Sequence, residues 1–332
     1  MGREEKTCSQ CYRQIVFLSL ALVESERLFF FRIMQKCIIR QTLGYSMQGL
    51  QADLNSEAQR RFGGLARLYG PQAYAALRQA HVAVVGIGGV GSWAVEALAR
   101  HGIGALTLVD LDHIAESNIN RQVHALSETL GQAKVEAMAA RIRGINPECR
   151  VTLVDDFLTP DNVAEVLPTQ VDVVIDCTDQ MSAKIAMVLQ ARVRRQPLIV
   201  CGGAGGKTDV LSMRIGDLSE ATHDALLARL RTVLRKQHGF VRAADQAGKP
   251  RKRIPKMGVR VLWLDQPTIL PEAWLGSRSD EEAGSEKGAG TDATGLQGLS
   301  CAGYGSSVTV TASMGLAAAA EAVNKIIHTQ LK

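Results

Sequence analysis

Four glycines directly follow an apolar run of the sequence: Gly86, Gly88, Gly89 and Gly91. Glycines at G-x-G-x-x-G spacing after a strand let the backbone approach a phosphate, and the helix that follows offers its N-terminus to the same group. A second apolar run ends at Asp110, where a carboxylate can bind a ribose hydroxyl. The pattern therefore predicts a nucleotide site. It does not decide the reaction, because hydride-transferring and ATP-cleaving enzymes both use it.

Polar residues further along the chain distinguish between these reactions. Asn120, Arg121 and Gln122 follow the second run, Lys134 begins a predicted helix, and Asp179 follows a later apolar run. Cleavage of ATP between its α- and β-phosphates needs cations that neutralise the leaving pyrophosphate, and a carboxylate that holds Mg²⁺. A dehydrogenase needs neither. We therefore predict an adenylating site to which Arg121 and Lys134 contribute the cations and an aspartate at the end of the later run, Asp176 or Asp179, contributes the carboxylate.

Apolar runs that alternate with amphipathic segments predict the elements that position these residues. The expected strands are His81–Val85, Leu106–Val109, Val151–Val154, Val171–Ile175 and Leu198–Cys201, and the expected helices are Val90–Arg100 and Lys134–Arg143. This alternation is typical of an α/β fold with a doubly wound, mostly parallel sheet, whose strand ends meet around one crevice. After Gly206 we expect an appended region: antiparallel strands over 210–215 and 259–264, a helix over 221–236, and a C-terminal packing helix over 308–328.

Composition divides the chain into three parts. Residues 1–46 hold four of the seven Phe and three of the seven Cys, and we interpret them as a non-native or disordered extension before a natural start at Met47. An added helical extension is the alternative. Residues 47–206 form the predicted ATP-binding core and residues 207–332 the appended region. Within the latter, 277–297 is rich in Gly, Ser and acidic residues, which indicates a disordered insertion.

Positive charge is concentrated in one segment of a chain whose formal net charge is +5. Residues 229–260 include eleven Lys or Arg and a single acid, Asp245. Such a cluster is a candidate footprint for nucleic acid, and Arg251, Lys252 and Arg253 form its densest run. The alternative is a solvated helix face followed by a polar loop.

The cysteines and apolar runs indicate a reducing compartment and no membrane span. Seven cysteines are scattered without the pattern of a disulfide framework, and Cys8 and Cys11 have no second pair at zinc spacing. The apolar run Ile15–Val23 is too short to cross a bilayer. We therefore expect a cytoplasmic protein without a structural zinc ion.

The segment 202–208 resembles a phosphate-binding G-x-x-x-x-G-K-T loop but departs from it in two ways. Its first glycine would have to be residue 201, which is Cys201, and a strand rather than a helix is expected after Lys207. We interpret these glycines as letting a loop pass close to the predicted nucleotide site.

From Arg61 to its C-terminus the chain resembles the ThiF/MoeB superfamily of adenylating enzymes, relatives of the ubiquitin-activating enzymes. Within it, the chain is similar to the branch that acts on threonylcarbamoyladenosine in tRNA. The matching stretches are 61–64, 66–70, 85–93, 120–122, 124–126, 145–149, 155–157 and 202–206.

This resemblance implies a Rossmann-like fold, a reaction and partners. ATP would activate the threonyl carboxylate of the modified base as an acyl-adenylate, with release of pyrophosphate. A nucleophile of the same modification would then close a ring and expel AMP. The implied partners are tRNA, a second copy of the chain in a homodimer, and cysteine-desulfurase or sulfur-acceptor proteins. Arg61 or Arg67 would act across the dimer.

The resemblance also implies residue roles, and the chain departs from part of the superfamily pattern. The glycines would approach the phosphates, Asp110 would bind the ribose, and Arg121, Gln122 and Lys134 would engage the phosphate chain. Arg121, Lys134 and Asp179 would be catalytic, Asp179 would also bind Mg²⁺, and Asn120 would belong to the ATP-binding residues. Beyond Gly206 the sequence lacks paired C-x-x-C motifs, and Cys301 is its single cysteine there. Three alternatives stay open: an adenylyltransferase for the C-terminus of a ubiquitin-like sulfur carrier, a nicotinamide-dependent oxidoreductase, and a nucleotide-sensing module without turnover.

Overall fold

The computed structural model describes residues 57–243, 249, 251, 254–270 and 304–330. The chain falls into two compact units, Met1–Arg61 and Phe62–Lys332. Of the first unit, the described residues are 57–61, which begin helix α4 (Glu57–Tyr69). The extension 1–46, the start at Met47 and the insertion 277–297 lie outside the described residues, as do Cys301, Lys252 and Arg253.

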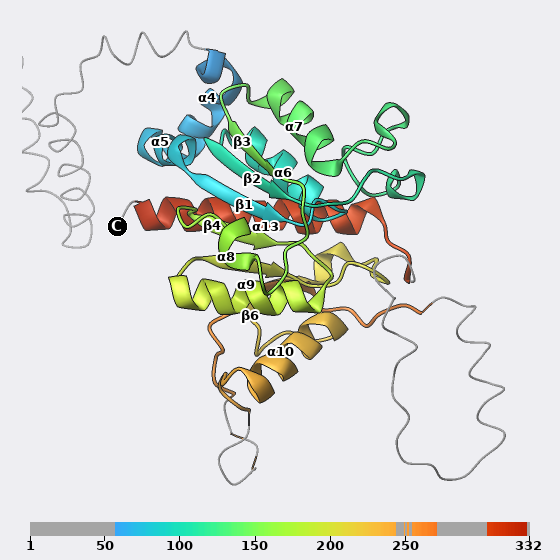
Figure 1. The fold of residues 1–332 in the computed structure, drawn as a ribbon. Helices are drawn as coiled ribbons and strands as arrows, with labels where there is room; N and C mark the ends of the chain where they lie inside the picture. Colours follow the sequence, from blue (N-terminus) through green and yellow to red (C-terminus); the bar gives the residue numbers. More distant parts are fainter. Residues whose placement is uncertain (1–56, 244–248, 250, 252–253, 271–303, 331–332) are drawn as a thin grey trace, which may run out of the picture. The chain divides into compact units, whose positions relative to one another are not determined.

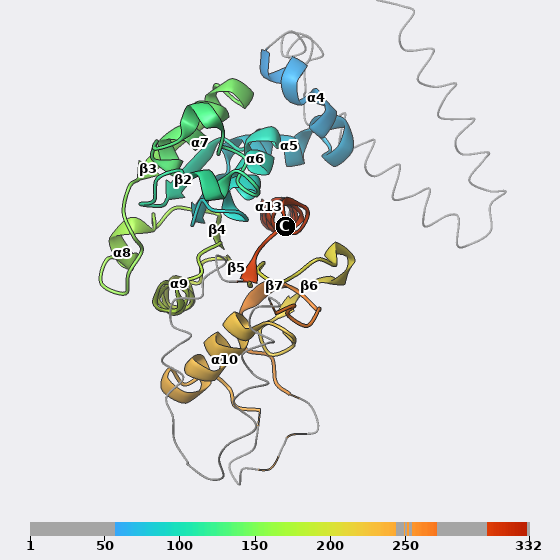
Figure 2. The ribbon, with the colours of Figure 1, turned by 90° about the vertical axis from the view of Figure 1, so that its right-hand side faces the viewer.

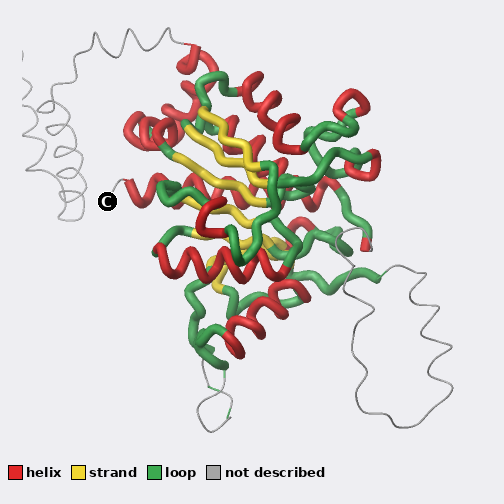
Figure 3. Tube along the Cα trace, viewed as in Figure 1, coloured by secondary structure: helices red, strands yellow, loops and turns green. Residues whose placement is uncertain are grey.

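A seven-stranded sheet forms the centre of the second unit (Figures 1 and 3). Its strands are β1 (His81–Val85), β2 (Ala105–Val109), β3 (Arg150–Val154), β4 (Val173–Asp176), β5 (Leu198–Cys201), β6 (Met213–Asp217) and β7 (Arg260–Leu264). Their order is β3-β2-β1-β4-β5-β7-β6, and all neighbours are parallel except the β6–β7 pair. The predicted doubly wound, mostly parallel fold is confirmed.

Helices cover both faces of this sheet. They are α5 (Pro71–Gln79), α6 (Gly91–Arg100), α7 (Lys134–Ile145), α8 (Val163–Val166), α9 (Met181–Arg194), α10 (Ala225–Gln237) and α13 (Val308–Gln330). Side chains alternate across each strand: Val82 and Val84 pack with α6, α7 and α13, whereas Ala83 and Val85 pack with α8 and α9. The inner strands β1, β2, β4, β5 and β7 are near-continuous apolar runs because both of their faces are buried, whereas the edge strands β3 and β6 are partly exposed.

Helix α13 crosses the first of these faces beside α6, as Figure 2 shows in a view along its axis. The close approach depends on Gly315, where a Cβ atom would lie 2.4 Å from the Val90 carbonyl oxygen and 2.7 Å from Trp93 Cβ. The predicted C-terminal packing helix is therefore observed, and it packs on the core through Met314, Ala318 and Ala322. None of the helices in the described part of the chain is long and apolar enough to cross a membrane.

The region after Gly206 differs in two details from the prediction. Strand β7 pairs in parallel with β5, so it extends the same sheet, and only β6 is antiparallel. The apolar run that forms β7 is buried over four of its five residues, which suits a position inside the sheet. The strand expected from Val210 begins only at Met213, because the Asp209 side chain accepts a hydrogen bond from Leu211 N and holds a 3₁₀ turn, η3 (Val210–Ser212).

Helix α10 likewise begins later than predicted, at Ala225 instead of residue 221. The Asp224 carboxylate accepts hydrogen bonds from Leu227 N at 2.9 Å and from Gly203 N at 2.9 Å. Asp224 thus caps the helix and ties its start to the glycine loop after β5. Burial raises the pKa of Asp224, and its backbone hydrogen bonds oppose that shift.

Candidate functional site

A cavity of about 280 Å³ opens at the carboxyl ends of β1 and β4, where the strand order reverses. This switch point is where open α/β sheets bind ligands. Eight of the predicted site residues line the cavity: Gly86, Gly88, Gly89, Asp110, Arg121, Gln122, Lys134 and Asp179. Sequence positions almost a hundred residues apart therefore converge on one crevice. Gly91 and Asn120 lie outside the lining.

The glycine turn between β1 and α6 is too tight to hold a side chain at two positions. Gly86 has φ +86°, and a Cβ atom added there would lie 2.9 Å from the Cys177 carbonyl carbon. A Cβ at Gly91 would lie 1.8 Å from the Gly86 carbonyl oxygen. Gly91 thus closes the turn without lining the cavity, and helix α6 starts at that residue with its N-terminus beside the turn.

Asp110 follows β2 and is bonded to the glycine turn. Its carboxylate accepts a hydrogen bond from Ile87 N at 2.5 Å and another from Asp112 N at 2.9 Å. Burial raises the pKa of Asp110, while the nearby Lys134 cation and these two hydrogen bonds lower it. A carboxylate offers about four lone-pair sites, so acceptor capacity is left for a ribose hydroxyl.

Lys134 is the first residue of α7, and its ammonium group lies between two carboxylates. The Nζ atom is 2.6 Å from Asp112 Oδ2 and 3.9 Å from Asp110 Oδ1. Its side chain is only 7% exposed, so the cation is held at the cavity wall in a setting that strengthens its field. An anion entering the cavity would meet a fixed positive charge at this point.

Arg121 lies in the loop after the 3₁₀ turn η1 (Glu116–Asn118), and its neighbours hold it in place. Its Nη1 donates to the Ser117 carbonyl at 2.6 Å and to Asn120 Oδ1 at 3.0 Å, and its own carbonyl accepts from Trp93 Nε1 at 3.0 Å. Asn120 Nδ2 donates to the Ser306 carbonyl at 3.2 Å. The structure therefore places Asn120 where it orients Arg121, and not in the cavity lining where ATP binding was predicted.

Gln122 presents an unused acceptor at the wall of the cavity. The residue is only 5% exposed, and its buried Oε1 has no hydrogen-bond partner among the residues that the structure describes. A buried polar atom without a partner is costly, and a donor from a bound ligand would remove that cost. The cavity residues thus fit a nucleotide, whose sugar and base both carry donors.

The loop after β4 carries Asp179 and is shaped by a buried ion pair. Asp176, at the end of β4, lies 3.1 Å from Lys184 Nζ, and both side chains are fully buried. Asp176 Oδ1 also accepts from Thr178 N at 3.0 Å and from Thr178 Oγ1 at 2.8 Å. This network turns the chain so that the exposed Asp179 lines the cavity.

The residues present fit a magnesium ion shared with a substrate better than a metal held by protein alone. In the described part of the chain no group of three or more His, Cys, Asp or Glu side chains could hold a metal ion. Mg²⁺ is usually held by one or two carboxylates together with substrate phosphates. Asp179 could supply one such carboxylate.

Lys207 belongs to the segment 202–208, which resembles a phosphate-binding loop, but its ammonium group is already hydrogen-bonded within the fold. Its Nζ donates to the His223 carbonyl at 2.7 Å and to the Gln266 carbonyl. The next element in the chain is the 3₁₀ turn η3, where a phosphate-binding loop would be followed by an α-helix. The glycines of this segment do border the nucleotide cavity, at Gly202 and Gly203. The segment therefore lies beside the cavity that the predicted nucleotide-site residues line.

Two cations of the basic segment 229–260 are engaged within the fold. Arg231 donates to the carbonyls of Leu218 and Ala221, and Arg235 donates to that of Val241, so these two cations hold the fold together. Arg251 is exposed. Of the two arginines expected to act across a dimer, Arg67 is exposed on α4, whereas Arg61 belongs to the first unit and pairs with Glu57 at 2.6 Å.

Sequence reasoning missed several residues that line the cavity, among them Asn118, Phe157, Thr178 and Thr311. Thr311 comes from α13, some two hundred residues after the glycines, and no local pattern marks it. The position of Phe157 was visible as part of the stretch 155–157, but nothing in that stretch assigned it to the cavity.

A doubly wound sheet with a glycine turn, buried lysine and acidic residues at its switch point defines an adenylating nucleotide-binding protein. The model of the ThiF family matches residues 62–332, so the chain belongs to the ThiF family. It is 43% identical over 268 residues to tRNA threonylcarbamoyladenosine dehydratase of Escherichia coli strain K12, a match covering 80% of this chain and 93% of that protein. The predicted resemblance is confirmed.

Other comparisons agree. The chain is 41% identical over 270 residues to the Haemophilus influenzae tRNA threonylcarbamoyladenosine dehydratase, covering 81% of this chain and 94% of the relative. The crystal structure of the E. coli tRNA N6-threonylcarbamoyladenosine dehydratase, TcdA, in complex with ATP matches with a TM-score of 0.68 and 40% identity, over 82% of this chain and 97% of that one. A second structure of TcdA contains AMP.

Proposed function

We propose that this chain catalyses the ATP-dependent dehydration of threonylcarbamoyladenosine next to the anticodon of tRNA, giving the cyclic form of that base. The observation that carries the proposal is the cavity at the β1–β4 switch point, with Lys134 fixed beside the glycine turn, in a chain that spans more than nine-tenths of two dehydratases of this name. TcdA has been crystallised with both ATP and AMP, which are the substrate and the product expected of an adenylation cycle.

The chemistry proceeds in two balanced steps. First, a carboxylate oxygen of the threonyl group attacks the α-phosphorus of ATP, and pyrophosphate leaves. Second, a nucleophile of the same modification attacks the activated carbonyl carbon, and AMP leaves with the former carboxylate oxygen. Adenylation is needed because a carboxylate is a poor electrophile with a poor leaving group. Ring closure needs no nucleophile from the enzyme, because the attacking group is already tethered.

The cavity residues would divide this work between them. Gly86, Gly88 and Gly89 bring backbone close to the phosphates, and Asp110 accepts from the ribose. Lys134 and Arg121 stabilise negative charge as pyrophosphate departs. The support for these roles is their common place around one cavity and, for Lys134, its fixed contact with Asp112. Gln122 offers its unpartnered oxygen to a donor of the nucleotide.

We further propose that Asp179 would hold Mg²⁺ together with the phosphates of ATP, and the bound ion would supply positive charge that stabilises the transferred phosphoryl group. Its exposure in the cavity supports this role, because a magnesium ion keeps several water ligands. Cytoplasmic location, a homodimer, and contacts with cysteine-desulfurase or sulfur-acceptor proteins remain predictions of the same proposal.

Pyrophosphate release in the presence of different acceptors tests the proposed function. We expect release to be stimulated by tRNA that carries threonylcarbamoyladenosine, and mass spectrometry of the digested tRNA to show the loss of one water from that base. Unmodified tRNA of the same sequence is the matched control. Stimulation by a ubiquitin-like carrier protein instead would assign the chain to carrier adenylation, and no stimulation by either would contradict the proposal.

A further inference from the structure

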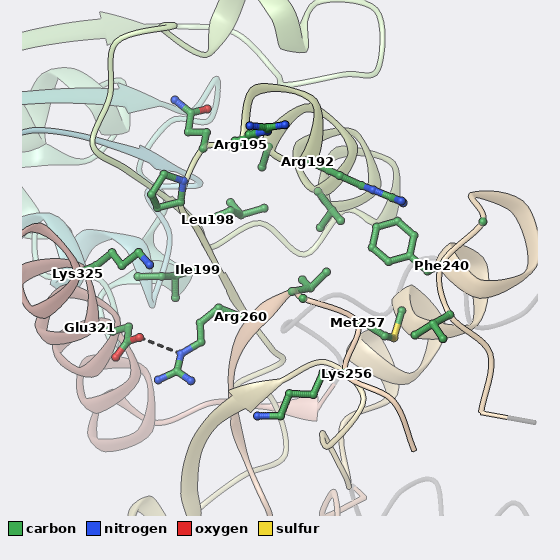
Figure 4. A pocket seen from close by; sticks show the side chains of 18 residues that line it. Arg192, Arg195, Leu198, Ile199, Phe240, Lys256, Met257, Arg260, Glu321 and Lys325 are labelled. Atoms are coloured by element: carbon green, nitrogen blue, oxygen red, sulfur yellow. Dashed lines mark hydrogen bonds and ion pairs between the residues drawn. The ribbon is translucent and has the colours of Figure 1, made fainter. Parts of the chain in front are cut away.

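A second and larger cavity, of about 980 Å³, lies away from the nucleotide site. We call it the amino-edge groove, because it borders the first residues of β5 and β7, Leu198 and Arg260. Figure 4 shows it from close by: apolar side chains form the floor, and cationic side chains stand around it. Its five cations are Arg192, Arg195, Lys256, Arg260 and Lys325.

The groove and the nucleotide cavity lie at opposite ends of the same elements. Strand β5 begins at the groove with Leu198, and the residues that follow its end, Gly202 and Gly203, line the nucleotide cavity. Helix α13 contributes Thr311 to the nucleotide cavity and Lys325 to the groove. At about 1.5 Å per residue, the helix between them is roughly 21 Å long.

The groove contains more cationic side chains than are paired with carboxylates. Arg260 pairs with Glu321 at 2.8 Å, and Lys256 lies 3.8 Å from Glu220. By contrast, the side chains of Arg192, Arg195 and Lys325 form no ion pair with any residue in the described part of the chain, and all three are exposed. These three cations, which we call the groove triad, are available to an anionic ligand.

One member of the groove triad also presents a flat surface. The Arg192 guanidinium lies over the Phe240 ring, 4.7 Å from its centroid, and Phe240 is itself buried. The ring therefore supports the guanidinium, which is itself exposed. Arginine planes of this kind stack on unpaired bases in RNA complexes.

We infer that the amino-edge groove is a second contact site for tRNA, at which the groove triad binds phosphates of a strand remote from the modified base. The inference depends on the proposed function, which supplies a polyanionic substrate at the other end of the same elements. Thr311 of the nucleotide cavity and Lys325 of the groove are separated by roughly 21 Å of helix α13. At about 3.4 Å per phosphate along a strand, some six phosphates cover that length. A single tRNA arm is therefore long enough to reach both.

The test is a triple variant that removes the charge of the groove triad, Arg192→Gln, Arg195→Gln and Lys325→Gln. We expect the Kd for full-length modified tRNA at about 0.1 M salt to rise about tenfold or more, because three phosphate contacts are lost. The slope of log Kd against log salt should fall by about 2. Affinity for ATP should stay within about twofold, since none of the three lines the nucleotide cavity.

A second triple variant is the matched control: Arg143→Gln, Arg150→Gln and Arg214→Gln remove three exposed cations outside the groove. We expect its Kd for tRNA to change less than about threefold, with most of the salt slope retained. Equal effects of both triple variants, or an unchanged Kd in the groove variant, would overturn the inference. If the unaltered enzyme did not turn over modified tRNA, the proposed function would be rejected instead. The Kd values of the two triple variants would still show whether the amino-edge groove binds tRNA.

Discussion

Lys134 is a buried cation in the lining of the cavity, and its ammonium group lies between the carboxylates of Asp110 and Asp112. In Lys134→Ala the two carboxylates lose their counter-ion and would repel the phosphates of ATP. We expect kcat for modified tRNA to fall at least about a hundredfold, the usual effect of removing one preorganised donor from a charged transition state. Single-turnover pyrophosphate release measures this step directly.

An exposed cation on the same helix is the control for that variant. Arg143→Ala, near the end of α7, should retain nearly full activity, because Arg143 is exposed and lies outside the cavity lining. Circular dichroism of Lys134→Ala should show the native helix content. A soluble, folded Lys134→Ala enzyme with normal kcat would remove Lys134 from the mechanism.

His124 gives the fold a sensitivity to acid. Burial and the Lys134 and Arg141 cations lower its pKa to about 4, and neither ring nitrogen has a hydrogen-bond partner among the described residues. In the unfolded chain a histidine has a pKa of about 6.5, so between pH 6.5 and 4 the unfolded state binds a proton that the folded state does not. The free energy of unfolding must therefore fall as the pH drops through this window.

The change His124→Phe should remove that dependence. Urea unfolding should be measured at pH 7 and at pH 5. Between these two pH values, the free energy of unfolding of the unaltered protein should fall by about 2 kcal/mol more than that of the variant. The ring of phenylalanine has a similar shape and leaves no polar atom unpaired, so the variant should be at least as stable at pH 5. Identical losses in the two proteins would show that His124 is not the group that titrates.

At the scale of elements, the buried Asp176–Lys184 pair joins the end of β4 to α9. Lys184 Nζ also donates to the Cys201 carbonyl at 2.8 Å, so one ammonium group links β4, β5 and α9 under the nucleotide cavity. Replacing Lys184 by Met would leave a carboxylate buried without its partner. We expect the free energy of unfolding to fall by about 3–5 kcal/mol, as measured by urea denaturation.

Val193→Ala, on the same helix, is the control for this prediction. Val193 is 80% exposed, and its truncation should change stability by less than about 0.5 kcal/mol. If Lys184→Met cost no more than Val193→Ala, the pair would not anchor the loop that presents Asp179.

For the whole molecule, the homodimer predicted from the resemblance places Arg61 or Arg67 of one copy in the site of the other. Sedimentation equilibrium should then give twice the mass of the chain. Mixing inactive Lys134→Ala with inactive Arg67→Ala should restore up to about a quarter of the normal activity, because half of the dimers are hybrids with one complete site.

The same mixing experiment with Arg61→Ala decides between the two arginines. The arginine that acts across the dimer is the one whose variant is inactive alone and is rescued by Lys134→Ala. If neither variant loses activity, no arginine of this helix completes the site. If one loses activity without rescue, that arginine acts within its own copy.

Local pattern was enough to predict much of the fold and part of the site. The positions of β1, β2 and β5 followed from apolar runs that are buried on both faces, and the glycine turn followed from its spacing. The start of α10 was misplaced although its N-cap, Asp224, is a local signal that accepts from Leu227 N; only the bond from Gly203 N to Asp224, across 21 positions, could not be read from the sequence. Pairing of β7 with β5 was missed for the same reason, since strand partners are set by packing between distant segments.

The sequence by itself was enough to predict a nucleotide site at a glycine turn and to select Arg121, Lys134 and Asp179 as residues suited to the cleavage of ATP, because residue type and spacing limit the chemistry available. Only the tertiary structure decided which of the polar residues meet. It turned Asn120 toward Ser306, buried Lys207 among carbonyls, and brought Thr311 of α13 into the cavity. It also gathered the groove triad from the C-terminal end of α9 and from α13. Contacts between segments far apart in sequence depend on how the sheet and helices pack, and no local pattern encodes that packing.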